Sequence, residues 1–321
     1  MTAAIVDLFA GPGGWDQGLK QNGRTDVVGI EWDEAACLTA TEAGHLRIRA
    51  DVEHYPPERF AGYEGLIASP PCQDFSLAGR RAGRTGTKGR LIDTVPEWVG
   101  QIMPEWVVCE QVPPCLSIWR EHASLYRELG YSAWCGVLNA ADYGVPQTRK
   151  RAILIASRVR VVTEPEPTHD KTPVAGLFGK LEPWVTMAQA LGWGFDSEPS
   201  CAVVAGGGET GGSEPFANAK YRARLQSFVA SGVTGNGLPK DPETDPADTI
   251  TGSGNAYWMS KKSWMSKNSL KVSTVEAGIL QSFPADYPWK GSRKKQYQQI
   301  GNAIPPLFAA HILKTAQGIK R

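Results

Sequence analysis

The chain has 321 residues, of which 41% are hydrophobic and 21% are charged, with a formal net charge of +1. This length predicts about two domains with a large buried core, and the composition excludes an intrinsically disordered chain. The near-zero net charge excludes a uniformly basic surface for nucleic acid, so any such surface has to come from local clusters of charge.

Cysteine and histidine usage argues against a metal site and a disulfide framework. No two of the six cysteines form a CxxC pair, and only five histidines are present. Scattered thiols in a chain of this size indicate a reducing compartment. The first residues lack the pattern of a signal peptide, and no apolar run approaches the roughly 20 residues of a membrane span. We therefore expect a cytoplasmic monomer without metal or membrane contact.

The first 160 residues alternate short apolar runs with stretches of helical character. Strands are expected at residues 4–9, 26–31, 65–68, 105–109 and 152–156, and helices at residues 17–21 and 34–43. Alternation of this kind predicts an α/β fold, in which helices cover both faces of a mostly parallel, Rossmann-like sheet.

A glycine-rich turn follows the first expected strand. Gly11, Gly13 and Gly14 let the backbone approach a ligand closely, although an ordinary strand-to-helix turn has the same composition. Glu31 ends the next strand, where dinucleotide folds place the acid that binds a ribose diol. Asp51 follows a further apolar stretch and could accept a hydrogen bond from an adenine amine. No Gly-Lys-Ser/Thr follows the turn, so a cofactor with adenosine and without phosphate is favoured.

The composition changes near residue 160. Proline and then glycine become frequent, and residues 195–270 lack helical periodicity, which predicts an irregular, partly β second domain. Helical character returns at residues 275–282 and 305–318, the latter beginning at a proline pair. We expect a first domain at residues 1–190, a second at residues 191–270, and a C-terminal segment at residues 271–321 that completes the first.

Four further motifs follow the glycine-rich turn, which reads Asp-Leu-Phe-Ala-Gly-Pro-Gly-Gly at residues 7–14. They are Ser-Pro-Pro-Cys at residues 69–72, Glu-Gln-Val at residues 110–112, Gln-Thr-Arg-Lys-Arg at residues 147–151 and Gly-Asn-Ala-Ile-Pro-Pro at residues 301–306. In this order the five blocks resemble those of the cytosine-C5 DNA methyltransferases. The resemblance covers residues 5–156 and 272–313, and it rests on the joint order of the blocks.

The resemblance implies covalent catalysis on a cytosine ring. Addition of the Cys72 thiolate to carbon 6 makes carbon 5 nucleophilic enough to attack a methyl sulfonium. Glu110 resembles the residue that protonates ring nitrogen N3, and burial favours the protonated form of a carboxyl group. Arg149 and Arg151 are expected to hold the base carbonyl oxygen and the flanking phosphates. Taken singly, a cysteine is more often structural, and a glutamate or a basic run is more often solvated.

The same resemblance implies that S-adenosylmethionine binds at the glycine-rich turn. The expected contacts are Asp7, Phe9, Gly11, Gly13, Gly14, Glu31, Trp32, Asp51, Pro71 and Asn302. Two positions depart from the family pattern. Gln111 stands where relatives usually carry asparagine, and its amide is expected to support the loop. Val275 stands where many relatives carry arginine, which leaves open how the second domain is anchored.

Double-stranded DNA is the expected partner, and the target base has to be flipped out of the duplex. The expected DNA contacts are Arg80, Arg81, Arg84, Lys88, Lys261 and Lys262. Between Asp74 and Asp93 the chain is basic, rich in glycine and free of acids, which predicts a mobile lid. A further basic stretch lies at residues 290–295. The second domain is expected to read one target sequence, whose identity depends on geometry.

Two alternatives remain open from the sequence. An RNA cytosine methyltransferase could use the same scaffold, and comparing methyl transfer to duplex DNA and to tRNA would distinguish them. A catalytically inactive DNA-binding homologue is the other alternative. The presence of Cys72, Glu110 and the arginine pair disfavours it.

Overall fold

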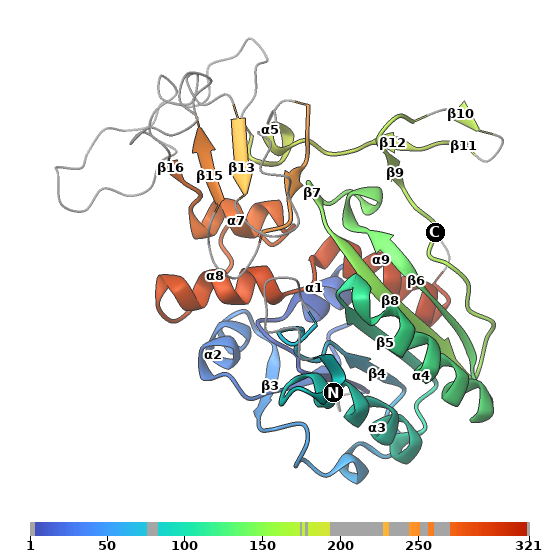
Figure 1. The fold of residues 1–321 in the computed structure, drawn as a ribbon. Coiled ribbons are helices and arrows are strands. Elements are labelled where there is room, and N and C mark those ends of the chain that lie inside the picture. The colour runs from blue at the N-terminus through green and yellow to red at the C-terminus, as the bar shows by residue number, and fades with distance from the viewer. Residues whose placement is uncertain are drawn as a thin grey trace.

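A seven-stranded sheet forms the centre of the molecule, with the strand order β3-β2-β1-β4-β5-β8-β6 (Figure 1). The computed structural model describes residues 4–75, 83–173, 175–176, 179–192, 227–230, 244–250, 256–259 and 270–319. The strands are β1 (Ile5–Leu8), β2 (Val27–Glu31), β3 (Leu46–Arg49), β4 (Gly65–Ala68), β5 (Trp106–Gln111), β6 (Ser132–Asn139) and β8 (Lys150–Ser157). β1 to β5 are parallel, whereas β8 is antiparallel to both β5 and β6. The mostly parallel α/β sheet predicted from the sequence is confirmed.

Helices cover both faces of this sheet. They are α1 (Gly14–Gln21), α2 (Glu34–Glu42), α3 (Thr94–Ile102), α4 (Leu116–Glu128) and α9 (Pro306–Gln317). Side chains of α3 and α4 share one buried cluster with the sheet, and side chains of α1 and α9 share another. As expected, α9 begins at the proline pair, with Pro305 as its N-cap residue. The last helix of the chain therefore completes the layer that the first helix begins.

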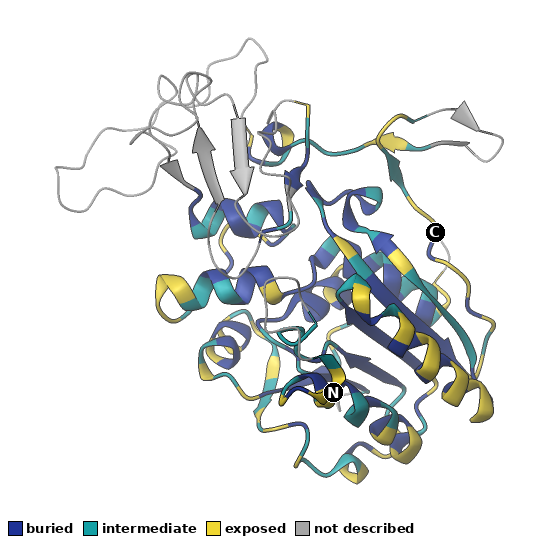
Figure 2. Ribbon diagram, in the orientation of Figure 1, coloured by how far each residue is buried: buried dark blue, intermediate teal, exposed yellow. Residues whose placement is uncertain are grey.

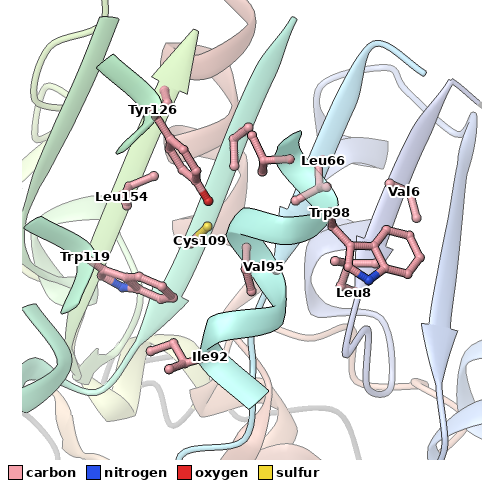
Figure 3. Close-up of a cluster of buried hydrophobic side chains, with 14 of the residues drawn as sticks. Val6, Leu8, Leu66, Ile92, Val95, Trp98, Cys109, Trp119, Tyr126 and Leu154 are labelled. Carbon is pink, nitrogen blue, oxygen red and sulfur yellow. The ribbon is translucent and has the colours of Figure 1, made fainter. Parts of the chain in front are cut away.

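The core between the sheet and the helices α3 and α4 consists of interlocking aromatic and aliphatic side chains. Trp98 of α3 packs beside Leu66 of β4, and Trp119 and Tyr126 of α4 lie over Cys109 of β5 (Figure 3). Burial of such large side chains contributes roughly 1.5–3 kcal/mol each. All six residues of β5 are buried, whereas the edge strands β3 and β6 are half-buried (Figure 2). The middle of the sheet is therefore its most buried part.

Smaller elements follow β6 along the chain. β7 (Gln147–Thr148) pairs with β14 (Ala247–Asp248), β9 (His169–Asp170) with β12 (Glu182–Pro183), and β10 (Ala175–Gly176) with β11 (Gly179–Lys180). A three-stranded antiparallel sheet contains β13 (Ser227–Ala230), β15 (Ala256–Met259) and β16 (Leu270–Lys271). The described residues also form the α-helices α5 (Met187–Ala190), α7 (Thr274–Leu280) and α8 (Arg293–Asn302).

The predicted second domain at residues 191–270 lies largely outside the described residues. The strands β13, β14 and β15 fall within its range, and its boundaries stay a prediction. In the described part of the chain, each helix is too short or too polar to span a lipid bilayer.

Candidate active site

The glycine-rich turn connects β1 to α1 at the carboxyl edge of the sheet. Phe9, Gly11 and Gly13 have φ angles of 60°, 55° and 108°, in the left-handed region that glycine adopts readily. A bulky residue such as Phe9 is strained there, and strain of this kind concentrates at functional turns. A Cβ atom on Gly14 would come within 2.3 Å of the carbonyl oxygen of Ile304. The turn is therefore packed tightly against the C-terminal segment.

Glu31 is buried at the end of β2 and binds this turn. Its Oε2 accepts a hydrogen bond from the N–H of Gly11 (2.9 Å), and its Oε1 accepts from the N–H groups of Trp32 (2.8 Å) and Asp33 (2.7 Å). Burial raises the pKa of Glu31, and the three backbone hydrogen bonds oppose this rise. The carboxyl group thus joins β2 to the turn, and its remaining lone pairs are suited to a ligand hydroxyl.

The other residues predicted to bind a cofactor differ in their exposure to solvent. The ring of Trp32 is 66% exposed, Asp51 and Asn302 are exposed, and Pro71 is half-buried. Asp51 also accepts a hydrogen bond from the backbone N–H two residues further on (3.1 Å). Asp7 is fully buried, and neither of its carboxyl oxygens has a hydrogen-bond partner among the described residues.

Cys72 follows β4 closely and carries a half-buried thiol. Burial raises the pKa of this thiol, and the nearby guanidinium of Arg151 lowers it. The carboxyl of Glu110 raises the pKa further, and the guanidinium of Arg149 opposes that effect. The thiol form of Cys72 therefore predominates at neutral pH, so nucleophilic attack requires that its proton leave.

Glu110 and Arg151 approach each other from the adjacent antiparallel strands β5 and β8. The Nε of Arg151 lies 2.7 Å from Oε1 of Glu110, and both side chains are largely buried. The Nη1 of Arg151 also donates to the carbonyl oxygen of Lys150 (2.7 Å). Three residues predicted from the sequence, Cys72, Glu110 and Arg151, are thus brought together.

Arg149 is held in a different way from Arg151. Its Nη2 donates to the carbonyl oxygens of Gly301 (2.9 Å) and Ala303 (3.0 Å), in the block that ends α8. Its Nε and Nη1 have no partner among the described residues. Burial lowers the pKa of Arg149 to about 9, the neighbouring Arg151 lowers it too, and Glu110 opposes the change. Arg149 lies between β7 and β8, and it therefore joins this part of the chain to the C-terminal segment. The sequence did not reveal this contact.

The loop that carries Cys72 is supported by two side-chain hydrogen bonds. The Nε2 of Gln111 donates to the carbonyl oxygen of Pro70 (2.9 Å), and its Oε1 accepts from the N–H of Val112 (2.7 Å). The Nε1 of Trp15 donates to the hydroxyl of Ser69 (2.8 Å). The amide at position 111 therefore supports the loop, as expected, and Trp15 is a support that the sequence analysis missed.

The predicted DNA contacts are only partly described. Arg84 pairs with the carboxylates of Asp93 and Glu121, with N–O distances of 2.6 Å to each. The Nζ of Lys88 lies 5.9 Å from the centre of the Trp32 ring. Arg80, Arg81, Lys261 and Lys262 lie outside the described residues. Arg84 is thus engaged by acids within the chain, and its contact with DNA stays a prediction.

Cations of the basic stretch at residues 290–295 also have acidic partners. The ammonium of Lys290 lies 3.3 Å from a carboxyl oxygen of Glu42, and Lys295 pairs with Asp33. These ion pairs hold the start of α8 against α2. They reduce the positive charge that this stretch presents to a nucleic acid.

Comparison with known proteins gives a consistent family assignment. The family model of the C-5 cytosine-specific DNA methylase matches residues 3–177 and 220–318. The type II methyltransferase M.NgoFVII of Neisseria gonorrhoeae is 26% identical over 97% of this chain and 85% of its own length. The type II methyltransferase M1.HphI of Haemophilus parahaemolyticus is 27% identical over 97% and 86%, respectively.

Solved structures show the same fold at lower sequence identity. The methyltransferase EhMeth of Entamoeba histolytica matches with a TM-score of 0.66 at 14% identity, over 100% of both chains. The Dnmt2 methyltransferase of S. pombe matches with a TM-score of 0.64 at 17% identity, over 98% of both chains. The family model covers well over half of the chain, and its two matched ranges contain all five sequence blocks. The chain therefore belongs to the C-5 cytosine-specific DNA methylase family and is a DNA cytosine-5 methyltransferase.

Proposed function

We propose that the chain transfers a methyl group from S-adenosylmethionine to carbon 5 of a flipped-out cytosine in duplex DNA, with Cys72 as the nucleophile. The observation that carries this proposal is the meeting of Cys72, Glu110 and Arg151 at one edge of the sheet. Cys72 follows β4, Glu110 is near the end of β5, and Arg151 is near the start of the antiparallel β8. Ligands bind at this carboxyl edge in open α/β sheets.

The residues around the glycine-rich turn fit S-adenosylmethionine. Glu31 is placed to accept hydrogen bonds from ribose hydroxyls, and the exposed ring of Trp32 offers an apolar face to an adenine. Asp51 is an acceptor for the adenine amine. The turn carries no lysine or arginine, in agreement with a cofactor that lacks phosphate. When bound, this cofactor supplies a methyl group attached to a sulfonium, which is an electrophile.

The proposed reaction begins when the Cys72 thiol loses its proton to solvent and its Sγ attacks carbon 6 of the cytosine. The electron pair of the C5–C6 double bond moves toward N3, which takes a proton from the carboxyl of Glu110, while Arg151 holds the base carbonyl oxygen. Carbon 5 would then bond to the methyl group as the bond between that group and the sulfonium sulfur breaks. A base removes the C5 proton, the C5–C6 double bond forms again, the bond from Cys72 Sγ breaks, and the N3 proton returns to Glu110.

Residues 191–270 are proposed to read the target sequence in the DNA. This segment is short, and the relatives M.NgoFVII and M1.HphI are type II methyltransferases, which supports a single target sequence. Bisulfite sequencing of DNA from cells that express the chain would identify the methylated cytosine. A duplex with that sequence is the substrate for the following test.

Covalent trapping tests the role of Cys72. Duplex DNA with 5-fluorocytosine at the target position blocks the final proton removal, so the bond between Cys72 and the base persists. We expect a denaturation-resistant adduct from the wild type with S-adenosylmethionine, and none from Cys72→Ala. The half-buried Cys135 is a matched control, and Cys135→Ala should form the adduct. An adduct from Cys72→Ala, or none from the wild type, would contradict the proposal. Adduct formation with tRNA instead of DNA would favour the RNA alternative.

A further inference from the structure

A buried ion pair between Arg47 and Asp16 lies beside the glycine-rich turn. Arg47 of β3 contacts Asp16 of α1 through two hydrogen bonds, Nη1 to Oδ1 (2.9 Å) and Nη2 to Oδ2 (2.7 Å). The two side chains are 2% and 0% exposed. Removing both charges from water is costly, and a buried pair is therefore weak evidence of a gain in stability. This pair calls for another explanation.

The path of Arg47 to this position depends on a glycine. Asp7, Gly29 and Arg47 are in register across the neighbouring strands β1, β2 and β3. A Cβ atom on Gly29 would come within 2.6 Å of Nη1 of Arg47, so only glycine lets the guanidinium cross β2. Burial raises the pKa of Asp7, the carboxyl of Asp16 raises it further, and the guanidinium of Arg47 opposes this rise. The side chain of Arg47 thus crosses β2 at Gly29 and acts on Asp7 of β1.

Glu31 and Arg47 bind the two peptide groups that flank the Cα atom of Gly11. The Nε of Arg47 donates to the carbonyl oxygen of Gly11 (3.4 Å), while the N–H of Gly11 donates to Glu31 (2.9 Å). Glu31 is the acid proposed to bind the ribose. A change in the position of Arg47 is therefore transmitted through Gly11 to Glu31.

Other side chains contact the next residues of the turn, Pro12 and Gly13. The hydroxyl of Tyr287 donates to the carbonyl oxygen of Pro12. A Cβ atom on Gly13 would lie 2.8 Å from His45 Cδ2 and 2.8 Å from the Tyr287 hydroxyl oxygen. The Nε2 atoms of His45 and Gln17 are 3.0 Å apart, which fixes the ring. The polar side chains of His45 and Tyr287 therefore pack against Pro12 and Gly13.

We propose that Arg47 and Asp16 are positioning residues for the cofactor, which fix the backbone of Gly11 and through it the carboxyl of Glu31. This inference rests on the proposed binding of S-adenosylmethionine at the turn. Both side chains are buried, so we expect them to affect the affinity for the cofactor and not the chemical step. The matching expectation is a raised KM for the cofactor with little change in kcat at saturating cofactor.

The test compares two arginine-to-lysine variants, at Arg47 of β3 and at Arg24 in the segment between α1 and β2. Arg47→Lys keeps the charge but loses the paired contact with Asp16 and the contact with Gly11. The control is Arg24→Lys, since Arg24 makes similar contacts with Asp26 and Glu64 at the opposite edge of the sheet. Binding of S-adenosylhomocysteine is measured by calorimetry, and the melting temperature is measured for each protein.

We expect Arg47→Lys to weaken binding of S-adenosylhomocysteine by about tenfold or more, which corresponds to about 1.4 kcal/mol. Arg24→Lys should bind it as the wild type does, although both variants melt at lower temperature. If Arg47→Lys lost melting temperature but kept wild-type affinity, the pair would be structural only and the inference would be wrong. An absence of binding by the wild type would instead overturn the proposed cofactor site and the inference with it.

A second variant addresses the case in which Arg47→Lys fails to fold. The double substitution Asp16→Leu with Arg47→Met replaces the buried charges by apolar side chains of similar size, a change that buried ion pairs often tolerate. We expect a folded protein with weakened binding of S-adenosylhomocysteine and unchanged binding of duplex DNA. Wild-type affinity for S-adenosylhomocysteine in this double variant would overturn the inference.

Discussion

The thiol of Cys72 is under opposing influences from its neighbours. Burial and the carboxyl of Glu110 raise its pKa, whereas the guanidinium groups of Arg151 and Arg149 lower it. Arg151 also contacts Glu110 at 2.7 Å, so one guanidinium acts on both the proposed nucleophile and the proposed acid. The two effects can be separated by measuring the reactivity of the thiol without DNA.

The variant Arg151→Met should raise the pKa of Cys72, because it removes the positive charge with the largest lowering effect. A thiol with a higher pKa has less thiolate at a given pH and reacts more slowly with iodoacetamide. We expect the pH profile of alkylation at Cys72 to move to higher pH, with several-fold slower reaction at pH 8. Mass spectrometry of the peptide that contains Cys72 distinguishes it from the other cysteines. An identical profile in Arg151→Lys, which keeps the charge, serves as the control.

Helix α4 packs on the sheet with a buried histidine on its inner face. The ring centroid of His122 lies 5.4 Å from that of Trp119 and 6.4 Å from that of Tyr126. Its Nε2 is 3.6 Å from a carboxyl oxygen of Asp93. Burial lowers the pKa of His122 to about 4, and Asp93 opposes this change. The folded protein therefore holds this histidine in its neutral form at physiological pH.

A lowered pKa makes the stability of this element depend on pH. Because the unfolded state binds a proton near pH 6.5 and the folded state only near pH 4, stability is lost as the pH falls between these values. We expect His122 to reduce the free energy of unfolding by about 2 kcal/mol between pH 7.5 and pH 5.0. Urea unfolding of the wild type and His122→Phe at both pH values measures it. Equal losses in the two proteins would contradict the prediction.

Elements with continuous apolar runs could be predicted from the sequence. The strands β1, β2, β4, β5 and β8 have such runs, because they are buried on both faces. The edge strands β3 and β6 were missed, because β3 alternates aliphatic side chains with arginine and the mostly apolar run of β6 is interrupted by Gly136. The helix α8 was missed as well, since its sequence is mostly polar and only Tyr297 and Ile300 anchor it in the core.

The candidate site was predictable as a set of residues but not as a geometry. The order of the blocks identified Cys72, Glu110 and Arg151, and the contact between the last two required the antiparallel pairing of β5 and β8. The contact of Arg149 with Gly301 joins residues 152 positions apart, a distance at which no local pattern gives information. The sequence likewise showed no sign that Arg47 reaches the turn, because that contact crosses an entire strand.

At the scale of the whole molecule, Arg149 connects the central sheet to the C-terminal segment. It donates to two carbonyl oxygens of that segment, at Gly301 and Ala303, and is 1% exposed. Arg149→Met would leave both buried carbonyl groups without this donor, at a cost of about 2 kcal/mol or more in the free energy of unfolding.

Urea unfolding measures this cost, with Lys150→Met as the matched control because Lys150 is the next residue in the chain and is exposed. We expect the Lys150→Met variant to unfold within about 0.5 kcal/mol of the wild type. A similar stability for both variants would show that the contacts of Arg149 contribute nothing measurable to joining the two segments.

Two residues of the C-terminal segment contact the glycine-rich turn. Ile304 packs against Gly14, and the hydroxyl of Tyr287 donates to the carbonyl oxygen of Pro12. A ribosome makes the turn before residues 191–270, and it makes Tyr287 and Ile304 after them. A nascent chain therefore lacks these contacts with the turn until residues 191–270 have also been made. The order of synthesis thus leaves the turn incomplete until the segment proposed to choose the target exists.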